Sequence, residues 1–254
     1  MIAVVREPAR SLAECELSFI DREHVDAALA AAQHAAYRDA LAACGFGVQC
    51  LPALEGLPDS VFVEDAAVVL DELIVLARPG APSRAPEVEA IAPHLTSLGR
   101  VERLQGGRLD GGDVLRIGRT LWVGLSGRTD AAGIGALRAI AAPLGYTLVA
   151  APIRGCLHLK TGATAVSDDT VIVNPAWVDP TPWRHLRVVE VHPTEPFGAN
   201  VLRAGGRVLV SDAAPRTADM LAALGFETLA VDIGELEKAE AGLTCLSLLL
   251  DPRP

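Results

Sequence analysis

The chain has 254 residues, 50% of them apolar and 21% charged, which is enough to bury a large core in one or two domains. Its formal net charge of −10 argues against sequence-independent binding to nucleic acid or to an anionic membrane, because both require a basic surface. An acidic balance favours a cationic small molecule as the partner instead.

Neither a disulfide framework nor a zinc ribbon is predicted, because the five cysteines are scattered and no two have CxxC spacing. The N-terminal segment MIAVVREPAR lacks the basic region and the long apolar run of a signal peptide. No apolar stretch approaches membrane-spanning length. These features predict a soluble, cytoplasmic protein.

In chain order, the first recurring pattern is a helix, a glycine and a short strand. It occurs around Gly45, Gly99, Gly145 and Gly225, and the residues before each glycine have helical apolar spacing. A glycine just beyond a helix is typical of a left-handed helix cap. The spacings are 54, 46 and 80 residues, and the last is close to twice a unit of about 40 residues.

The second recurring pattern is a hairpin of two short apolar strands around a polar or glycine-rich turn. Four hairpins are expected at 66–80, 114–125, 163–175 and 201–212. A strand that begins at Cys245 and continues through LSLLL needs a partner, and MIAVV at the N-terminus is the natural one. Strands that alternate with helices at a fixed period predict repeated α/β units closed on themselves.

The residue at the mouth of each hairpin is expected to face one central cavity. These five residues are separated by 48, 49, 38 and 45 positions, and they are Asp65, Asp113, Gly162, Asn200 and Cys245. Because the counterparts of Cys245 in other units are acidic or polar, this position favours a functional thiol over a core thiol.

The polar residues near the mouths form a set with a definite chemistry. A cysteine attacks as a thiolate, and a nearby imidazole such as His158 can move its proton. Extra carboxylates suit a substrate that is itself a cation, and a guanidinium is matched by carboxylates in bidentate geometry. Two arginines, Arg84 and Arg128, could hold a carboxylate at the other end of the substrate.

Each signal also has a structural interpretation. Cys245 alone is typical of a small buried hydrophobe, and His158 alternates with apolar residues as a hydrogen-bonded structural histidine does. The segments LDGGDV and PDSVFVED are compatible with ordinary turns. Cys156 and His158 supply two metal ligands at most, without recognised zinc spacing, so no metal site is expected.

Six motifs occur in an order that resembles the dimethylarginine dimethylaminohydrolases of the guanidine-modifying superfamily. They are PDSVFVED (58–65), LDGGDVL (109–115), LSGRT (125–129), CLHLKT (156–161), GAN (198–200) and AGLTCLSL (241–248). The resemblance spans essentially the whole chain. It implies the pentein fold, a five-bladed α/β propeller with pseudo-five-fold repeats, as a single catalytic domain over 1–254.

The resemblance also implies roles for individual residues. Cys245 matches the nucleophile, His158 the general acid and base, and Asp110 the acidic partner, a position at which some relatives have Glu. The other matched positions are substrate-binding: Asp59, Phe62, Glu64 and Asp65 at the guanidinium, Arg84 and Arg128 at the amino-acid end, and Leu17 and Ala239 through backbone contacts.

The implied reaction is hydrolysis of N-omega-methylated arginine to citrulline and dimethylamine or methylamine, through a covalent cysteine intermediate and without cofactor or metal. Two alternatives stay open: another guanidine hydrolase such as arginine deiminase, and a non-catalytic binder of cationic amino acids. The paired arginines disfavour agmatine, which has no carboxylate. A homodimer is also left open.

Overall fold

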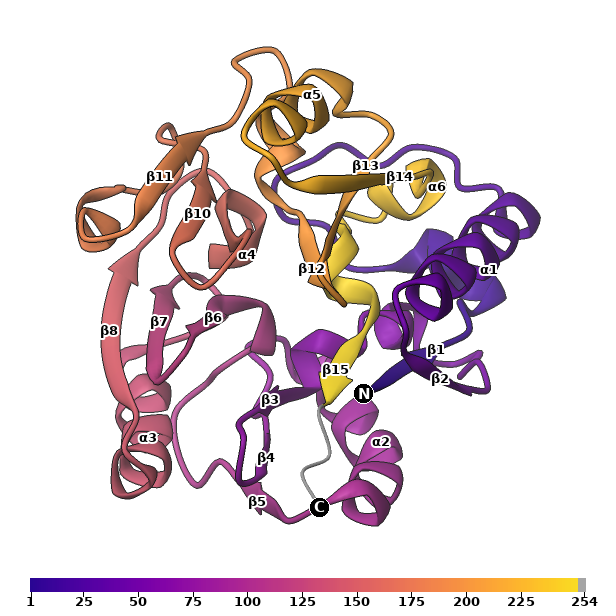
Figure 1. Ribbon diagram of the computed structural model, residues 1–254. Helices are drawn as coiled ribbons and strands as arrows, with labels where there is room; N and C mark the ends of the chain where they lie inside the picture. The colour runs from indigo at the N-terminus through magenta and orange to yellow at the C-terminus, as the bar shows by residue number, and fades with distance from the viewer. Residues whose placement is uncertain (251–254) are drawn as a thin grey trace.

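Five three-stranded sheets of one topology surround a common centre in the computed structural model, which describes residues 1–250 (Figure 1). In each sheet the central strand pairs antiparallel with an inner strand and parallel with an outer strand. The central strands are β1 (Ile2–Arg6), β4 (Ile74–Leu76), β7 (Thr120–Leu125), β10 (Thr170–Val173) and β13 (Arg207–Ser211).

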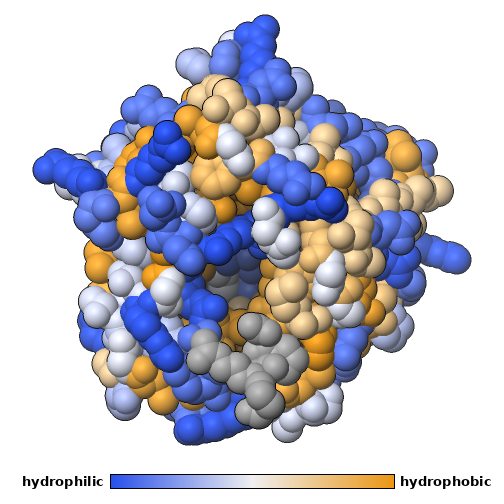
Figure 2. Space-filling view, viewed as in Figure 1, coloured by the Kyte–Doolittle hydropathy of each residue, from blue (hydrophilic) through white to orange (hydrophobic). Residues whose placement is uncertain are grey.

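The inner strands line a central cavity of about 320 Å³. They are β15 (Leu248–Leu250), β3 (Ala67–Val69), β6 (Val114–Ile117), β9 (Ala163–Ala165) and β12 (Leu202–Ala204). A hollow at the centre of the face drawn in Figure 2 lies where these strands converge in Figure 1, with hydrophilic residues along much of its rim.

All five expected hairpins are present as antiparallel pairs of inner and central strands. The fifth pair joins the two ends of the described chain, because β1 pairs with β15 in a register that sets Ile2 opposite Leu250. The prediction of repeated units closed on themselves is therefore confirmed. The strand of the fifth hairpin begins at Leu248 rather than at Cys245.

The outer strands follow crossover connections, as parallel pairing requires. They are β2 (Gly47–Leu51), β5 (Val101–Arg103), β8 (Thr147–Pro152), β11 (Arg187–Glu190) and β14 (Glu227–Val231). Four crossovers contain an α-helix: α1 (Ala27–Ala43), α2 (Ala85–Leu98), α3 (Ala131–Ala141) and α5 (Pro215–Ala223).

Three of the four expected glycine caps have the left-handed conformation, with φ of 89° at Gly45, 85° at Gly145 and 94° at Gly225. Gly99 follows α2 with a φ of 175°, which is extended backbone open to any residue. The prediction of a left-handed cap at Gly99 is therefore wrong.

The fourth unit explains the long spacing between the last two glycines. Its crossover between β10 and β11 contains only a turn of 3₁₀ helix, η7 (Thr181–Trp183). Trp183 is fully buried there and packs against Trp122 with ring centroids 5.9 Å apart. A buried indole therefore occupies this crossover in place of an α-helix. The sequence consequently has no helix and glycine pattern before β11.

The core consists of apolar clusters that each combine residues from neighbouring sheets. Val4, Ile74 and Leu248 share one such cluster, which joins the sheet of the chain ends to the sheet of β3, β4 and β5. Each sheet thus buries apolar surface against both neighbours, which holds the ring together. Within residues 1–250, no helix has the length and apolar character needed to cross a membrane.

Short helices complete the chain between these elements. Five of them precede the inner strands, either directly or after one or two residues: η3 (Val63–Ala66), η5 (Gly111–Asp113), α4 (Leu159–Gly162), η8 (Pro196–Ala199) and η9 (Leu243–Leu246). The others are η1 (Arg10–Glu14), η2 (Pro58–Val61), η4 (Pro82–Arg84), η6 (Ala142–Leu144) and α6 (Gly234–Glu237).

Candidate functional site

The hairpin mouths predicted from the sequence lie on or beside the five short helices that precede the inner strands. These helices contact one another around the centre: η3 packs against η5 and η9, and α4 packs against η5 and η8. All five sheets therefore contribute side chains to one region, as the repeat predicts. Most of the site residues predicted from the six sequence motifs lie in this region.

Cys245 lies in η9 and is half-buried. The amide of Gly242 donates a hydrogen bond of 3.4 Å to its Sγ. Burial, then the negative charges of Glu64 and Asp65, raise the pKa of the Cys245 thiol to about 12. The thiol is therefore neutral at physiological pH, and neutralising the charge of those carboxylates lowers its pKa and favours the thiolate.

A tyrosine of helix α1 holds the turn that carries Cys245. The hydroxyl of Tyr37, which is fully buried, lies 2.9 Å from the carbonyl oxygen of Leu243 and 2.7 Å from the hydroxyl of Ser247. These two contacts bracket Cys245 along the chain. The nucleophile position is thus held by buried hydrogen bonds, which are costly to leave unmade.

His158 and Asp110 form a buried pair. The Nε2 of His158 lies 3.0 Å from Oδ2 of Asp110, and its Nδ1 lies 3.7 Å from Oδ1 of Asp65. Burial alone would lower the pKa of His158, but Asp65, the bond to Asp110 and the charge of Asp113 outweigh it and raise the pKa to about 9. The imidazole is therefore protonated at neutral pH and can act as an acid.

The backbone around His158 is also anchored by carboxylates. Asp113 accepts a bond of 2.9 Å from the amide of Leu159 and one of 2.6 Å from the hydroxyl of Ser126. Asp110 accepts a bond of 2.7 Å from the amide of Gly80 through its other oxygen. The histidine is consequently oriented by two neighbouring residues of the LDGGDV motif, which is more than an ordinary turn provides.

Glu64 and Asp65 are adjacent but serve different neighbours because they lie on the 3₁₀ turn η3 rather than on a strand. Asp65 pairs with Arg84 at 2.5 Å and accepts a bond of 2.9 Å from the amide of Gly112. Burial alone would raise the pKa of Asp65, but His158 and Arg84 outweigh it and hold that pKa below its usual range. Asp65 therefore influences both the imidazole and the thiol.

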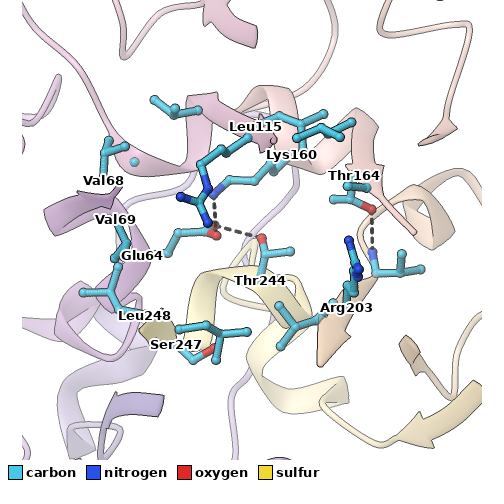
Figure 3. A pocket seen from close by; sticks show the side chains of 18 of the residues that line it. Glu64, Val68, Val69, Leu115, Lys160, Thr164, Arg203, Thr244, Ser247 and Leu248 are labelled. Carbon is cyan, nitrogen blue, oxygen red and sulfur yellow. Dashed lines mark hydrogen bonds and ion pairs between the residues drawn. The ribbon is translucent and has the colours of Figure 1, made fainter. Parts of the chain in front are cut away.

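Glu64 points toward the central cavity, where it meets Lys160 and Thr244 (Figure 3). The ammonium of Lys160 lies 2.5 Å from one Glu64 oxygen, and the hydroxyl of Thr244 donates a bond of 2.8 Å to the other. Burial raises the pKa of Glu64, and Lys160 offsets this only in part. Glu64 is thus an incompletely neutralised carboxylate beside the thiol.

Three residues of this network were not among the site residues predicted from the sequence. Lys160, Thr244 and Asn200 are joined because the amide nitrogen of Asn200 donates to the carbonyl oxygen of Lys160 at 2.9 Å and to the hydroxyl of Thr244 at 3.1 Å. Lys160 and Asn200 stood at or near hairpin mouths. That position signals proximity to the centre, but not which partner each residue binds.

Asp59, Phe62, Leu17 and Ala239 lie at the edge of this region. The carboxylate of Asp59 accepts the amide of Glu16 at 3.2 and 3.3 Å, so it anchors the segment that contains Leu17. Phe62 and Ala239 are buried, and Leu17 is partly buried against the same apolar cluster. The structure therefore brings Leu17 and Ala239 into one cluster, consistent with neighbouring backbone contacts.

The two arginines differ in what they bind. Arg84 is buried and pairs with Asp65 at 2.5 Å and with Glu87 at 2.8 Å, and it also donates to two backbone carbonyl oxygens. Arg128 lies 3.7 Å from Asp110 through its Nη1. That Nη1 is buried and has no hydrogen-bond partner among residues 1–250. Of these two arginines, Arg128 is therefore the one that can donate a further hydrogen bond.

Asp65, Asp110 and His158 offer ligand atoms within 4.8 Å of one another, a spacing compatible with a metal ion. The polar atoms of these side chains are already engaged, since Asp65 binds Arg84 and Gly112, and Asp110 binds His158 and Gly80. The donor set thus serves an internal hydrogen-bond network.

The arrangement can support attack by a cysteine on a cationic carbon. Six carboxylates share this network with three permanent cations and the protonated His158. The carboxylates are Asp59, Glu64, Asp65, Glu87, Asp110 and Asp113, and the permanent cations are Arg84, Arg128 and Lys160. A buried excess of negative charge favours a substrate that brings its own positive charge. Fold and site together define the class of guanidine-modifying enzymes.

Comparison with known proteins agrees with this class. The family described as arginine deiminase matches residues 52–196. A curated N(G),N(G)-dimethylarginine dimethylaminohydrolase from Streptomyces coelicolor is 45% identical over 98% of this chain and 96% of its own length. The chain belongs to the dimethylarginine dimethylaminohydrolase family.

Two further relatives extend the comparison. The dimethylarginine dimethylaminohydrolase from Pseudomonas aeruginosa is 33% identical over 96% of this chain and 97% of its own length. A solved structure of the enzyme from that organism, in complex with citrulline, superposes with a TM-score of 0.93 at 32% identity and covers 97% of both chains. The N-terminal domain of the arginine dihydrolase ArgZ shares the fold, with a TM-score of 0.87 at 21% identity over 97% of this chain and 96% of that one.

Proposed function

We propose that this protein hydrolyses N-omega-methylated arginine to citrulline and an alkylamine, with Cys245 as the nucleophile. The observation that carries the proposal is the half-buried thiol beside Glu64 and Asp65. Burial, and then the negative charge of these two carboxylates, raise the pKa of this thiol to about 12. A guanidinium placed against these carboxylates lowers that pKa again. The substrate thus activates the group that attacks it, and the thiol proton passes to solvent because His158 is already protonated.

The protonation state of His158 fits the next step. Its pKa of about 9 keeps the imidazole protonated at neutral pH. The Cys245 thiolate attacks the guanidinium carbon, and His158 gives its proton to the departing dimethylamine or methylamine. A carbon–sulfur bond has then replaced one carbon–nitrogen bond, which leaves an S-alkylthiouronium intermediate.

The second half of the reaction reverses the role of the histidine. Neutral His158 takes a proton from water, and the hydroxide adds to the thiouronium carbon. The carbon–sulfur bond then breaks to release citrulline, and the proton of the added hydroxyl passes to the departing thiolate to restore the Cys245 thiol. Asp110 holds the ring in place through its 3.0 Å contact with Nε2. One water is consumed in each cycle, and the amine leaves with the proton from His158.

The amino-acid end is assigned to Arg128, with Leu17 and Ala239 as backbone contacts. Arg128 is favoured because its buried Nη1 has no hydrogen-bond partner within residues 1–250, so a substrate carboxylate would complete its bonding. Arg84, by contrast, is assigned to holding Asp65 in position. The sequence alone gave both arginines the same role.

Unmethylated arginine is the second candidate substrate, because the arginine deiminase family matches residues 52–196. The experiment is a panel of asymmetric dimethylarginine, monomethylarginine, arginine and agmatine, with citrulline and released amine measured. Methylated arginines should turn over fastest. Faster ammonia release from arginine would favour a deiminase, and an absence of product from every compound would favour a binder.

Glu64→Gln sharpens the same test. Citrulline formation should fall by about 10²-fold or more, the scale for losing one electrostatic group of an active site. Alkylation of Cys245 by iodoacetamide should become faster, because removing the Glu64 charge lowers the thiol pKa. Glu237→Gln is the matched control, since Glu237 is a half-buried acid that bonds Ser211 instead. Unchanged turnover in Glu64→Gln would contradict the proposal.

A further inference from the structure

Glu240 is the one non-glycine residue with positive φ in the part of the chain that the structure describes, at 61°. A left-handed conformation at a non-glycine residue costs about 1 kcal/mol or more. Such a cost persists only where surrounding contacts hold the residue in place. The contacts of the Glu240 side chain therefore indicate its role.

The carboxylate of Glu240 binds a loop that is distant in sequence. One oxygen accepts the amide of Ser18 at 2.8 Å, and the other accepts the amide of Phe19 at 3.0 Å. Asp59 accepts the amide of Glu16 on the other side of Leu17. Leu17 therefore lies between two carboxylate anchors, and its backbone is fixed from both directions.

The same residue is covalently next to Ala239. Glu240 thus ties the Leu17 segment to the Ala239 segment, the two places assigned backbone contacts with the substrate. The loop is also held further along, because the ammonium of Lys238 donates to the carbonyl oxygen of His24 at 3.3 Å and the amide of Asp26 donates to Glu235 at 2.8 Å. These contacts dock the loop of residues 16–26 on the segment 235–240.

The carboxylate of Glu240 also lies within electrostatic reach of the chemistry. Burial raises the pKa of Glu240, and the loop amides, His158 and Arg128 offset that rise. A cavity of about 490 Å³ is lined by Ile20 and Glu23 of the loop and by Glu240 and Gly242. The loop and the segment before Cys245 therefore line the same cavity.

We propose that Glu240 is a positioning residue that fastens the loop of residues 16–26 against the amino-acid end of the bound substrate. The inference rests on the proposed function, because it takes Leu17 and Ala239 as substrate contacts. Glu240 does not touch the reacting atoms. It sets the distance between two backbone segments that the substrate must bridge.

The experiment compares Glu240→Gly, Glu240→Gln and Glu237→Gln with the wild type. Glycine keeps the left-handed backbone without strain and removes the carboxylate. It therefore tests the loss of the hydrogen bonds to the loop without disturbing the backbone. Glutamine keeps the size but retains only one acceptor oxygen for two amides. Glu237→Gln is the control, because Glu237 is a nearby half-buried acid that bonds Ser211 and not the loop.

Two readouts are taken. Hydrogen exchange at the amides of Ser18 and Phe19 should speed up by about tenfold or more in Glu240→Gly, as expected when a net hydrogen bond is lost. KM for methylated arginine should rise by about tenfold, with kcat within about threefold. Glu240→Gln should lie between, and Glu237→Gln should match the wild type in both readouts.

Exchange that stays at the wild-type rate at Ser18 and Phe19 would overturn the proposal. So would faster exchange with an unchanged KM, since the loop would then be fastened without positioning the substrate. A wild type that makes no citrulline would refute the proposed function instead. In that case the exchange rates still decide whether Glu240 holds the loop.

Discussion

The two ends of the proposed site are built in different ways. At the guanidinium end, Cys245, His158 and Glu64 lie on or beside short helices that lead into inner strands of three different sheets. At the amino-acid end, Leu17 lies in an irregular loop, and Arg128 lies in the connection before α3. The sheets thus position the residues assigned to the reaction, whereas side-chain hydrogen bonds between loops position those assigned to substrate recognition.

This difference predicts how each end responds to mutation. Substituting a group that the strands position should lower kcat without a large change in the rest of the molecule, provided that the substitution leaves no buried charge unpaired. Substituting a group that the loops position should instead weaken substrate binding and raise KM. The measurements below test this division, from the largest expected effect to the smallest.

Cys245→Ser should lower turnover by about 10⁴-fold or more, the scale for removing a catalytic nucleophile. Wild-type protein quenched during turnover should carry a substrate-derived mass on the Cys245 peptide. Cys156→Ser is the control, because Cys156 is buried and its thiol bonds the carbonyl oxygen of His158 at 3.5 Å. An adduct on Cys156 would mean that the wrong thiol has been assigned.

Arg84→Ala should lower the free energy of unfolding by about 3–5 kcal/mol, because it leaves Asp65 and Glu87 buried without their cation. Arg128→Ala should lower it by less than Arg84→Ala does, because the ion pair of Arg128 with Asp110 is long, at 3.7 Å, and Asp110 keeps His158 as a partner. Urea denaturation of the two variants measures both values. Equal losses would show that the two arginines share one structural role.

The stability of the protein should depend on the charge of His158. Its pKa is raised to about 9 in the folded state, so its protonation stabilises the fold fully below the unfolded pKa of about 6.5 and this stabilisation is lost as pH rises through 9. The expected loss is on the order of 3 kcal/mol. Urea denaturation between pH 6 and 10 measures it, and His158→Gln should remove most of this slope.

Arg128→Ala should weaken binding of methylated arginine by about 1.5–3 kcal/mol, the range for a charge-assisted hydrogen bond. The effect should appear in KM, with little change in kcat. An alkylguanidine without a carboxylate serves as the matched substrate, and its KM should barely move. If both substrates lose affinity equally, Arg128 does not bind the carboxylate.

The same division explains how far the sequence could be interpreted. The mouths at Asp65, Asp113 and Cys245 were predictable because a repeated hairpin has a visible period of about 40–50 residues, and the structure brings these positions together. Closure through β1 and β15 was predictable because an apolar strand needs a partner. Both inferences use patterns that recur along the chain.

Other features have no such pattern. The crossover of the fourth unit is filled by Trp183 instead of a helix, so β11 has no helix or glycine cap before it. The left-handed conformation of Glu240 and the partners of Lys160 and Asn200 depend on contacts between distant segments. The saturation of Arg84 is likewise visible only once Asp65 and Glu87 are placed around it.

The pairing of β1 with β15 has a consequence for the order in which the protein matures. Ile2 and Leu250 are among the first and last described residues to leave the ribosome, and their strands join only after the whole ring is synthesised. Such long-range pairing is slow, because the entropy of closing a long loop must be overcome before the contact forms. Cys245 lies three positions before β15, so the thiol reaches the centre in the same event that closes the ring. Cys245, His158 and the carboxylates are therefore brought together only when the ring closes.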